Sequence, residues 1–133
     1  MNETAAKNTV LLHADGYIEV KLQGDQTFET IERVARDCRG LVDQLTFAHK
    51  RVLGLINLSG ERNFSTGSNK AAMEALSGFN YDRVAMFGGT TVTTEVGSLI
   101  VKALGKSENT RVFKTREEAV AWLLMRDPLH SSF

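Results

Sequence analysis

Two short segments of the chain carry groups that could accept or bind phosphate. Residues 59–68 (SGERNFSTGS) are rich in hydroxyl side chains and come directly before a predicted helix. A phosphate on Ser65 or Thr66 would lie against the free N–H groups at the start of that helix, where negative charge is favoured. Residues 88–91 (GGTT) also lead from a strand into a predicted helix, and such a turn can bind a phosphate or a carboxylate through its N–H groups.

Each of these segments also has a purely structural interpretation. Ser65 or Thr66 suits the N-cap of the following helix, and the glycines suit a tight turn. No lysine follows the second glycine, so residues 88–91 are not a nucleotide-binding P-loop. Both segments follow predicted parallel strands, and open α/β sheets bind ligands at that edge. The predicted site residues are Asn57, Ser59, Phe64, Ser65 and Thr66 in a phospho-switch or partner segment, and Gly88, Gly89, Thr90 and Thr91 in an anion or ligand turn.

The remaining reactive side chains form no catalytic or metal-binding pattern in the sequence. His13, His49 and His130 are far apart and make no HxxxH or HxH pair. Cys38 is the single cysteine and falls on the apolar stripe of a predicted helix, which favours a core position, because a reactive thiolate needs exposure and a neighbouring base or cation. We therefore predict no catalytic residue, no metal and no cofactor, and we rank an enzyme below a binding protein.

Net charge and the length of apolar runs limit the kinds of partner and the cellular location that we expect. The 133 residues carry 16 Lys plus Arg and 16 Asp plus Glu, so the formal net charge is zero. A nucleic-acid-binding domain usually has a basic excess, and we therefore expect no nucleic-acid partner. No apolar run approaches the ~20 residues that span a bilayer, and the first eight residues lack the apolar core of a signal peptide. These features predict a cytoplasmic protein without a transmembrane segment.

Hydrophobic periodicity predicts one α/β domain at residues 9–126, between a leader at 1–8 and a tail at 127–133. Strands separated by helices pair in parallel, and the first strand adds an antiparallel edge through an Asp15-Gly16 two-residue turn. The predicted order is ββαβαβαβα, with strands at about 9–13, 17–22, 51–58, 83–87 and 110–113, and helices at about 28–45, 66–77, 92–104 and 115–126.

Local signals indicate where these elements end. Gly24-Asp25 is expected to end the second strand, and Ser59 to begin a polar loop that runs to Phe64. The predicted helix caps are Thr27 and a capping box of Thr115 with Glu118. We expect the elements to enclose one hydrophobic interior that contains Leu53, Ile56, Val84 and Trp122.

Three segments of this chain resemble the SpoIIAA-like, or STAS, fold of the anti-sigma-factor antagonists, and in particular the branch of bacterial proteins labelled SpoIIAA-like or STAS/SEC14. They are residues 55–60 (LINLSG), 81–88 (YDRVAMFG) and 111–124 (RVFKTREEAVAWLL), of which the last is the most specific. The resemblance covers roughly residues 9–125. It implies a mostly parallel five-stranded sheet with an antiparallel edge strand and four helices.

Regulatory members of that family are phosphorylated on a serine at the start of the helix after the third strand, in an Asp-Ser-Ser/Thr-Gly pattern. Here Phe64 precedes Ser65, Thr66 and Gly67 in place of the acidic residue, and Asn57 replaces the aspartate that ends the strand. The resemblance implies a non-enzymatic regulatory or protein-interaction module that binds a protein partner or a second copy of itself. The alternative is a carrier or sensor of a small apolar or anionic ligand at the carboxyl ends of the strands.

Overall fold

A five-stranded mixed sheet forms the centre of the molecule. The computed structural model describes residues 7–64, 66–89, 105 and 108–125. The strand order is β1-β2-β3-β4-β5; β1 pairs with β2 antiparallel, and every later neighbour pairs in parallel. The predicted α/β class, the parallel pairing of the later strands and the antiparallel edge strand are therefore confirmed. The elements are β1 (Thr9–Leu12), β2 (Tyr17–Gln26), α1 (Phe28–Phe47), β3 (Leu53–Phe64), α2 (Thr66–Gly78), β4 (Arg83–Phe87), β5 (Thr110–Phe113) and α4 (Arg116–Leu124).

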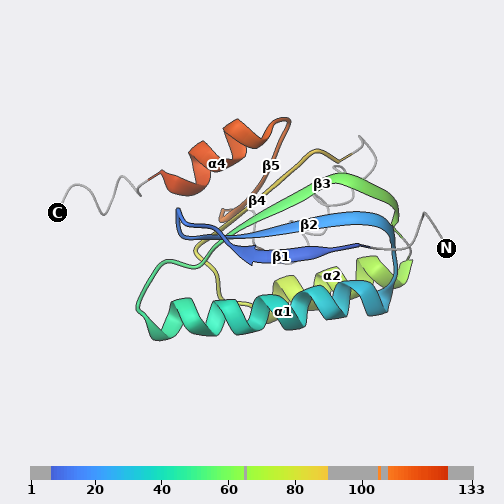
Figure 1. Cartoon of the computed structure of the whole chain (residues 1–133), viewed down its shortest axis with the longest axis horizontal. Helices are drawn as coiled ribbons and strands as arrows, with labels where there is room; N and C mark the ends of the chain where they lie inside the picture. The colour runs from blue at the N-terminus through green and yellow to red at the C-terminus, as the bar shows by residue number, and fades with distance from the viewer. Residues whose placement is uncertain (1–6, 65, 90–104, 106–107, 126–133) are drawn as a thin grey trace.

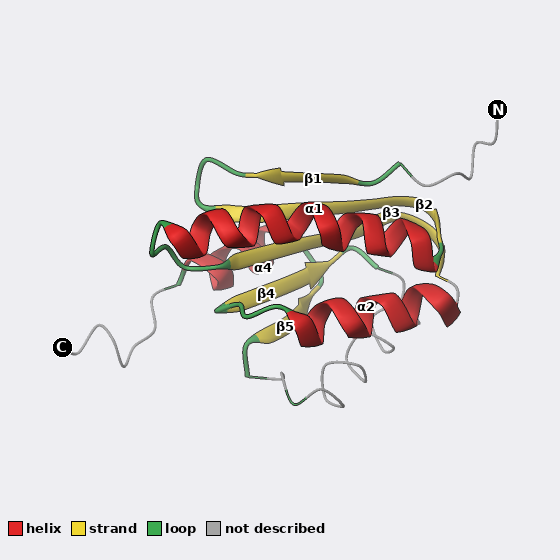
Figure 2. Cartoon of the chain, turned by 90° about the horizontal axis from the view of Figure 1, so that it is seen from below, coloured by secondary structure: helices red, strands yellow, loops and turns green. Residues whose placement is uncertain are grey.

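The helices divide unequally between the two faces of the sheet (Figure 1). The long helices α1 and α2 lie side by side on one face, as Figure 2 also shows, and among the described helices α4 is the one that lies on the other face. The predicted helix at 92–104 lies outside the described residues. No helix in the described part of the chain is long and apolar enough to cross a membrane.

The hydrophobic core has two layers, so the expectation of one shared interior is wrong. Ile56 and Val84 pack towards α1 and α2, whereas Leu53 and Trp122 belong to the cluster beneath α4. The physical reason is the two-residue period of a strand, which turns successive side chains to opposite faces of the sheet. A continuous apolar run such as that at the start of β3 supplies both layers at once.

The turn between β1 and β2 is a hairpin with three loop residues instead of two. The N–H of His13 donates to the carbonyl of Tyr17 (2.8 Å), and the N–H of Gly16 donates to the carbonyl of His13 (2.9 Å). Gly16 has a φ of 97°, which an L side chain rarely adopts. This is the three-residue loop that places a glycine at the left-handed position, so Ala14 joins Asp15 and Gly16 in the loop.

Strands β2 and β3 both continue past their predicted ends. Residues 24–26 of β2 pair with residues 61–64 of β3, with register shifts after Lys21 and after Gly24. The expected break at Gly24-Asp25 and the expected loop at 59–64 are therefore both wrong. Each polar segment satisfies the backbone hydrogen bonds of the other, and bulges at the two register shifts accommodate the additional residues of β3.

A buried amide network lies at the end of this extension. Gln26 is 1% exposed and exchanges reciprocal hydrogen bonds of 2.9 Å with the side chain of Asn8. Its Oε1 also accepts from Oγ1 of Thr30 in the first turn of α1 (3.0 Å). Because these bonds satisfy the buried amide, a polar residue can end the strand inside the fold.

Both predicted helix caps are present, with one change of detail. The hydroxyl of Thr27 accepts from the N–H of Thr30, whose own hydroxyl accepts from the N–H of Thr27. The hydroxyl of Thr115 accepts from the N–H of Glu118 (3.2 Å) and donates to Oε1 of Glu118 (3.1 Å). The glutamate thus bonds the capping hydroxyl instead of the backbone N–H of a full capping box.

Candidate functional site at the carboxyl end of the sheet

Asn57 fixes the backbone where β3 passes the end of its pairing with β4. Its Oδ1 accepts from the N–H of Ser59 (2.9 Å) and from the hydroxyl of Ser59 (2.6 Å). An amide side chain that bonds the backbone two residues ahead is a local turn-like contact. Asn57 therefore holds the Ser59 hydroxyl in one place on an exposed part of the strand.

Gly88 brings the second predicted segment against the first. It directly follows β4 and has a φ of 82°. A Cβ built at this position would come within 2.9 Å of Cβ of Ser59 and 3.0 Å of its backbone nitrogen. Only a glycine meets both requirements, since it has no Cβ and tolerates positive φ. The structure thus places Ser59 and Gly88 together at the carboxyl ends of β3 and β4.

The other predicted site residues do not share this contact. Phe64 is the last residue of β3, and α2 begins at Thr66. Phe64 lies five residues after Ser59 along β3, which corresponds to roughly 16 Å of extended chain. Continuation of β3 therefore carries Phe64 and the start of α2 away from Gly88. Gly89 is half-buried, whereas Ser65, Thr90 and Thr91 lie outside the described residues.

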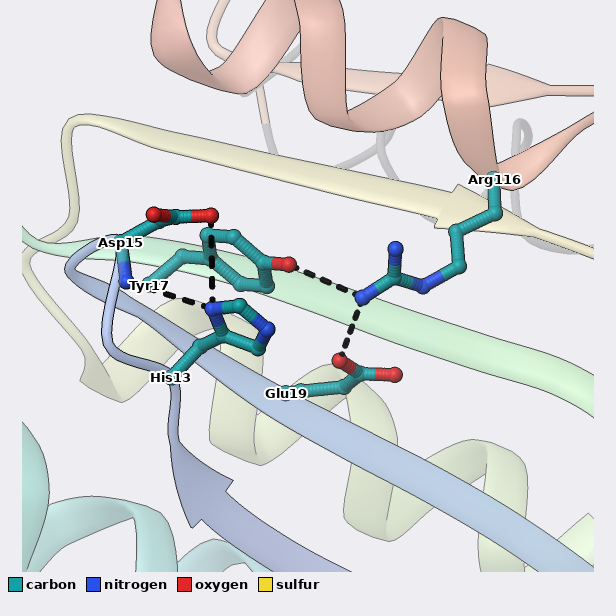
Figure 3. A network of polar contacts seen from close by, with 5 residues as sticks. All are labelled: His13, Asp15, Tyr17, Glu19 and Arg116. Carbon is teal, nitrogen blue, oxygen red and sulfur yellow. Dashed lines mark hydrogen bonds and ion pairs between the residues drawn. The ribbon is translucent and has the colours of Figure 1, made fainter.

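A second polar cluster, formed by His13, Tyr17, Glu19 and Arg116, was not predicted from the sequence (Figure 3). Nη2 of Arg116 donates to Oη of Tyr17 and to Oε1 of Glu19, each at 2.9 Å. His13 stacks on the ring of Tyr17 with centroids 4.5 Å apart, and Tyr17 is only 1% exposed. The bond to Glu19 raises the pKa of the guanidinium further above its usual value. This cluster ties the start of α4 to β2.

Arginines also hold the other end of α4. The guanidinium groups of Arg83 and Arg111 lie 5.1 Å and 5.3 Å from the centre of the Trp122 ring. Nη1 of Arg83 donates to the carbonyls of Trp122 (2.6 Å) and Met125 (3.0 Å) where the helix ends. Cations there complement both the aromatic face and the negative end of the helix dipole. The expectation that Trp122 anchors the last helix to the sheet is confirmed.

Local sequence patterns did not predict the cluster around Arg116. Tyr17 and Glu19 fall on the outward side of an alternating strand, and Arg116 falls inside a capping motif. The contacts join residues 97 and 99 positions apart. The one available signal was a bulky Tyr17 on the side of the strand assigned to solvent.

Cys38 packs as predicted against the cluster beneath α1, where it is half-buried. Burial, and secondly the charge of Asp37, raises the pKa of its thiol to about 11. Such a thiol is a poor nucleophile at neutral pH. Within the described ranges, no group of three His, Cys, Asp or Glu side chains could hold a metal ion.

The fold and this edge of the sheet define an α/β domain with an antiparallel edge strand and helices on both faces. A model of the SpoIIAA-like family matches residues 17–124, so the chain belongs to the SpoIIAA-like family. A similar solved structure is an uncharacterised protein of the DUF3478 family with a SpoIIAA-like fold from Shewanella loihica PV-4. Its TM-score is 0.67 at 17% identity, over 92% of this chain and 98% of that one. No curated protein matches the sequence.

Proposed function

We propose that this protein is a regulatory protein-interaction module whose partner binds the carboxyl end of the sheet and the helix that follows it. Members of the SpoIIAA-like family are commonly regulatory and generally not enzymes. The observation that carries the proposal is the contact between Ser59 and Gly88, because it unites two chemically distinctive segments on one exposed edge. Two hydrogen bonds to Asn57 orient Ser59 before a partner binds, and such preorganisation reduces the entropic cost of binding.

Helix α2 extends this surface. Met73 is 37% exposed on it. Between α1 and α2 lies a hollow of about 280 Å³, which is lined by alanines and by charged side chains of both helices. The charged lining suits polar side chains of a protein better than an apolar small molecule, which favours an interaction module over a carrier. The charged residues are Glu32, Arg36, Arg39 and Glu74.

Affinity capture from the source cells tests the proposal. The wild-type chain should retain a defined protein, Met73→Glu should lose it at least about tenfold, and Leu124→Glu should retain it. Leu124 is a matched control, since it is 41% exposed and lies on the opposite face of the sheet. Equal loss by both variants, or no retained protein, would contradict the proposal. A small molecule bound in native mass spectra of the purified protein would favour the carrier instead.

A phosphorylation switch at Ser65 or Thr66 is the second part of the proposal. Helix α2 begins at Thr66 and has no acidic residue in its first turn, so a phosphate there would meet the positive end of the helix without a repelling carboxylate. Intact mass of the protein from its own cells should show one added phosphate, and Ser65→Ala with Thr66→Ala should remove it. An unmodified mass in all growth conditions would argue against the switch.

A further inference from the structure

The outer edge of β1 is an open strand edge. β1 is the first strand in the order of the sheet, and no other described strand pairs with its outer side (Figure 1). Its sequence, Thr9-Val10-Leu11-Leu12, contains no charge, no proline and no glycine. Natural sheets usually protect their edges with such residues, so this edge can accept another strand.

Hydrogen-bond alternation identifies the free groups. The N–H of His13 bonds the carbonyl of Tyr17, and the N–H of Lys7 bonds the carbonyl of Gln23, each at 2.8 Å. Odd-numbered residues of this strand therefore point their backbone groups towards β2. The backbone N–H and C=O groups of Val10 and Leu12 therefore point outward, and these two residues lie symmetrically on either side of Leu11.

The exposure of the Leu11 side chain is the second observation that favours an added strand at this edge. Leu11 pairs with Glu19 on the α4 side of the sheet and is 48% exposed, because α4 contacts β3, β4 and β5 instead. On the opposite side of the strand, Val10 and Leu12 already pack against the main core. A strand added at this edge would cover Leu11 on the α4 side of the sheet. On the opposite side, it would extend the main core next to Val10 and Leu12.

We infer that a second copy of this chain occupies the edge, with the two β1 strands antiparallel and the symmetry axis at Leu11. Val10 of each copy then pairs with Leu12 of the other, which satisfies the outward backbone groups. The two Leu11 side chains meet across the axis as a directly opposed pair. An uncharged strand on a chain of zero net charge brings two copies together without repulsion. This interface is independent of the surface proposed for a protein partner.

Cysteine cross-linking tests the register. Leu11→Cys should form a disulfide-linked dimer on mild oxidation at pH 8, since directly opposed residues lie within the Cα separation that a disulfide allows. Thr9→Cys is the matched control: its two copies would be about 13 Å apart along the strands and should not cross-link. Cys38 should stay silent in both variants, because its thiol has a pKa of about 11.

Two further measurements keep the inference testable if a variant folds poorly. Light scattering of the unmodified chain should give a dimer mass, and Val10→Pro should give a monomer, because proline removes the outward N–H of residue 10 and no N–H that bonds β2. In the unmodified dimer, amide exchange at Val10 and Leu12 should be slowed on the order of 100-fold relative to the monomer. A monomeric unmodified chain, unprotected Val10 and Leu12 amides, or equal cross-linking at Thr9 and Leu11 would overturn the inference.

Discussion

The two faces of the sheet are stabilised in different ways. Towards α1 and α2, the sheet presents aliphatic side chains to helices of 20 and 13 residues. Towards α4, a helix of nine residues covers a smaller apolar cluster. Contacts of Arg116 at its start and of Arg83 and Arg111 at its end hold that helix in place.

This difference indicates that buried apolar area stabilises the face covered by α1 and α2, whereas directional polar contacts add to the stability of the face covered by α4. Burial of apolar surface has no preferred direction and scales with area, so a long amphipathic helix suffices on one face. A short helix buries less, and directional hydrogen bonds and cation–π contacts fix its position. Changes on the α4 face should therefore affect the placement of one helix as well as stability.

The largest expected effect is at Trp122. Trp122→Ala removes a 7%-exposed ring and the surface on which Arg83 and Arg111 lie, and we expect a loss of about 3–5 kcal/mol in the free energy of unfolding. Urea denaturation followed by circular dichroism measures it. Leu45→Ala on the other face should cost about 2–5 kcal/mol, and Phe47→Ala, at 88% exposure, less than about 0.5 kcal/mol. A Trp122→Ala loss no greater than that of Phe47→Ala would contradict the role of α4.

The contact between Ser59 and Gly88 should give the second largest effect. Gly88→Ala combines positive φ with a Cβ 2.9 Å from Ser59, and we expect a loss of about 2–3 kcal/mol. Gly16→Ala separates the two causes, because that residue also has positive φ but its Cβ would meet nothing within 4 Å. Its loss should be nearer to about 1 kcal/mol. Equal losses in chemical denaturation would show that crowding at Ser59 is unimportant.

The ion pair at the start of α4 should have a smaller effect. A double-mutant cycle of Arg116→Ala and Glu19→Gln should give a coupling of about 0.5–1 kcal/mol, since Arg116 is 42% exposed and solvent screens the pair. The coupling should fall in 1 M salt. A coupling that is zero at low salt would assign the position of α4 to Trp122 alone.

The smallest effect concerns Cys38 on the α1 face. The pKa of its thiol is raised from 9.0 to about 11, so folding favours the protonated form. This contribution to stability is complete below pH 9 and is lost as the pH rises through about 11. Alkylation of the native protein by iodoacetamide should be slow at pH 8 and accelerate towards pH 11. Alkylation at pH 8 as fast as that of the urea-unfolded chain would contradict the burial of the thiol.

Much of the fold followed from local sequence. The alternation of Ile18, Val20 and Leu22 predicted β2, and the cap at Thr27 predicted the start of α1, because period and capping chemistry act within a few residues. The family resemblance was likewise carried by contiguous segments, and the match over residues 17–124 confirms it. Asn57, Ser59 and Gly88 were assigned to candidate sites for the same reason.

The sequence by itself therefore determined the order of the described elements, the parallel or antiparallel sense of the strands, and the starts of α1, α2 and α4. Only the tertiary structure decided that residues 59–64 are strand, that the core has two layers and that Arg116 contacts Tyr17 and Glu19. The reason is physical: a polar segment becomes a strand when a partner strand satisfies its backbone. The contact between the Arg116 guanidinium and the Glu19 carboxylate depends on how the whole chain folds. Neither this contact nor the pairing of residues 59–64 can therefore be predicted from a local sequence pattern.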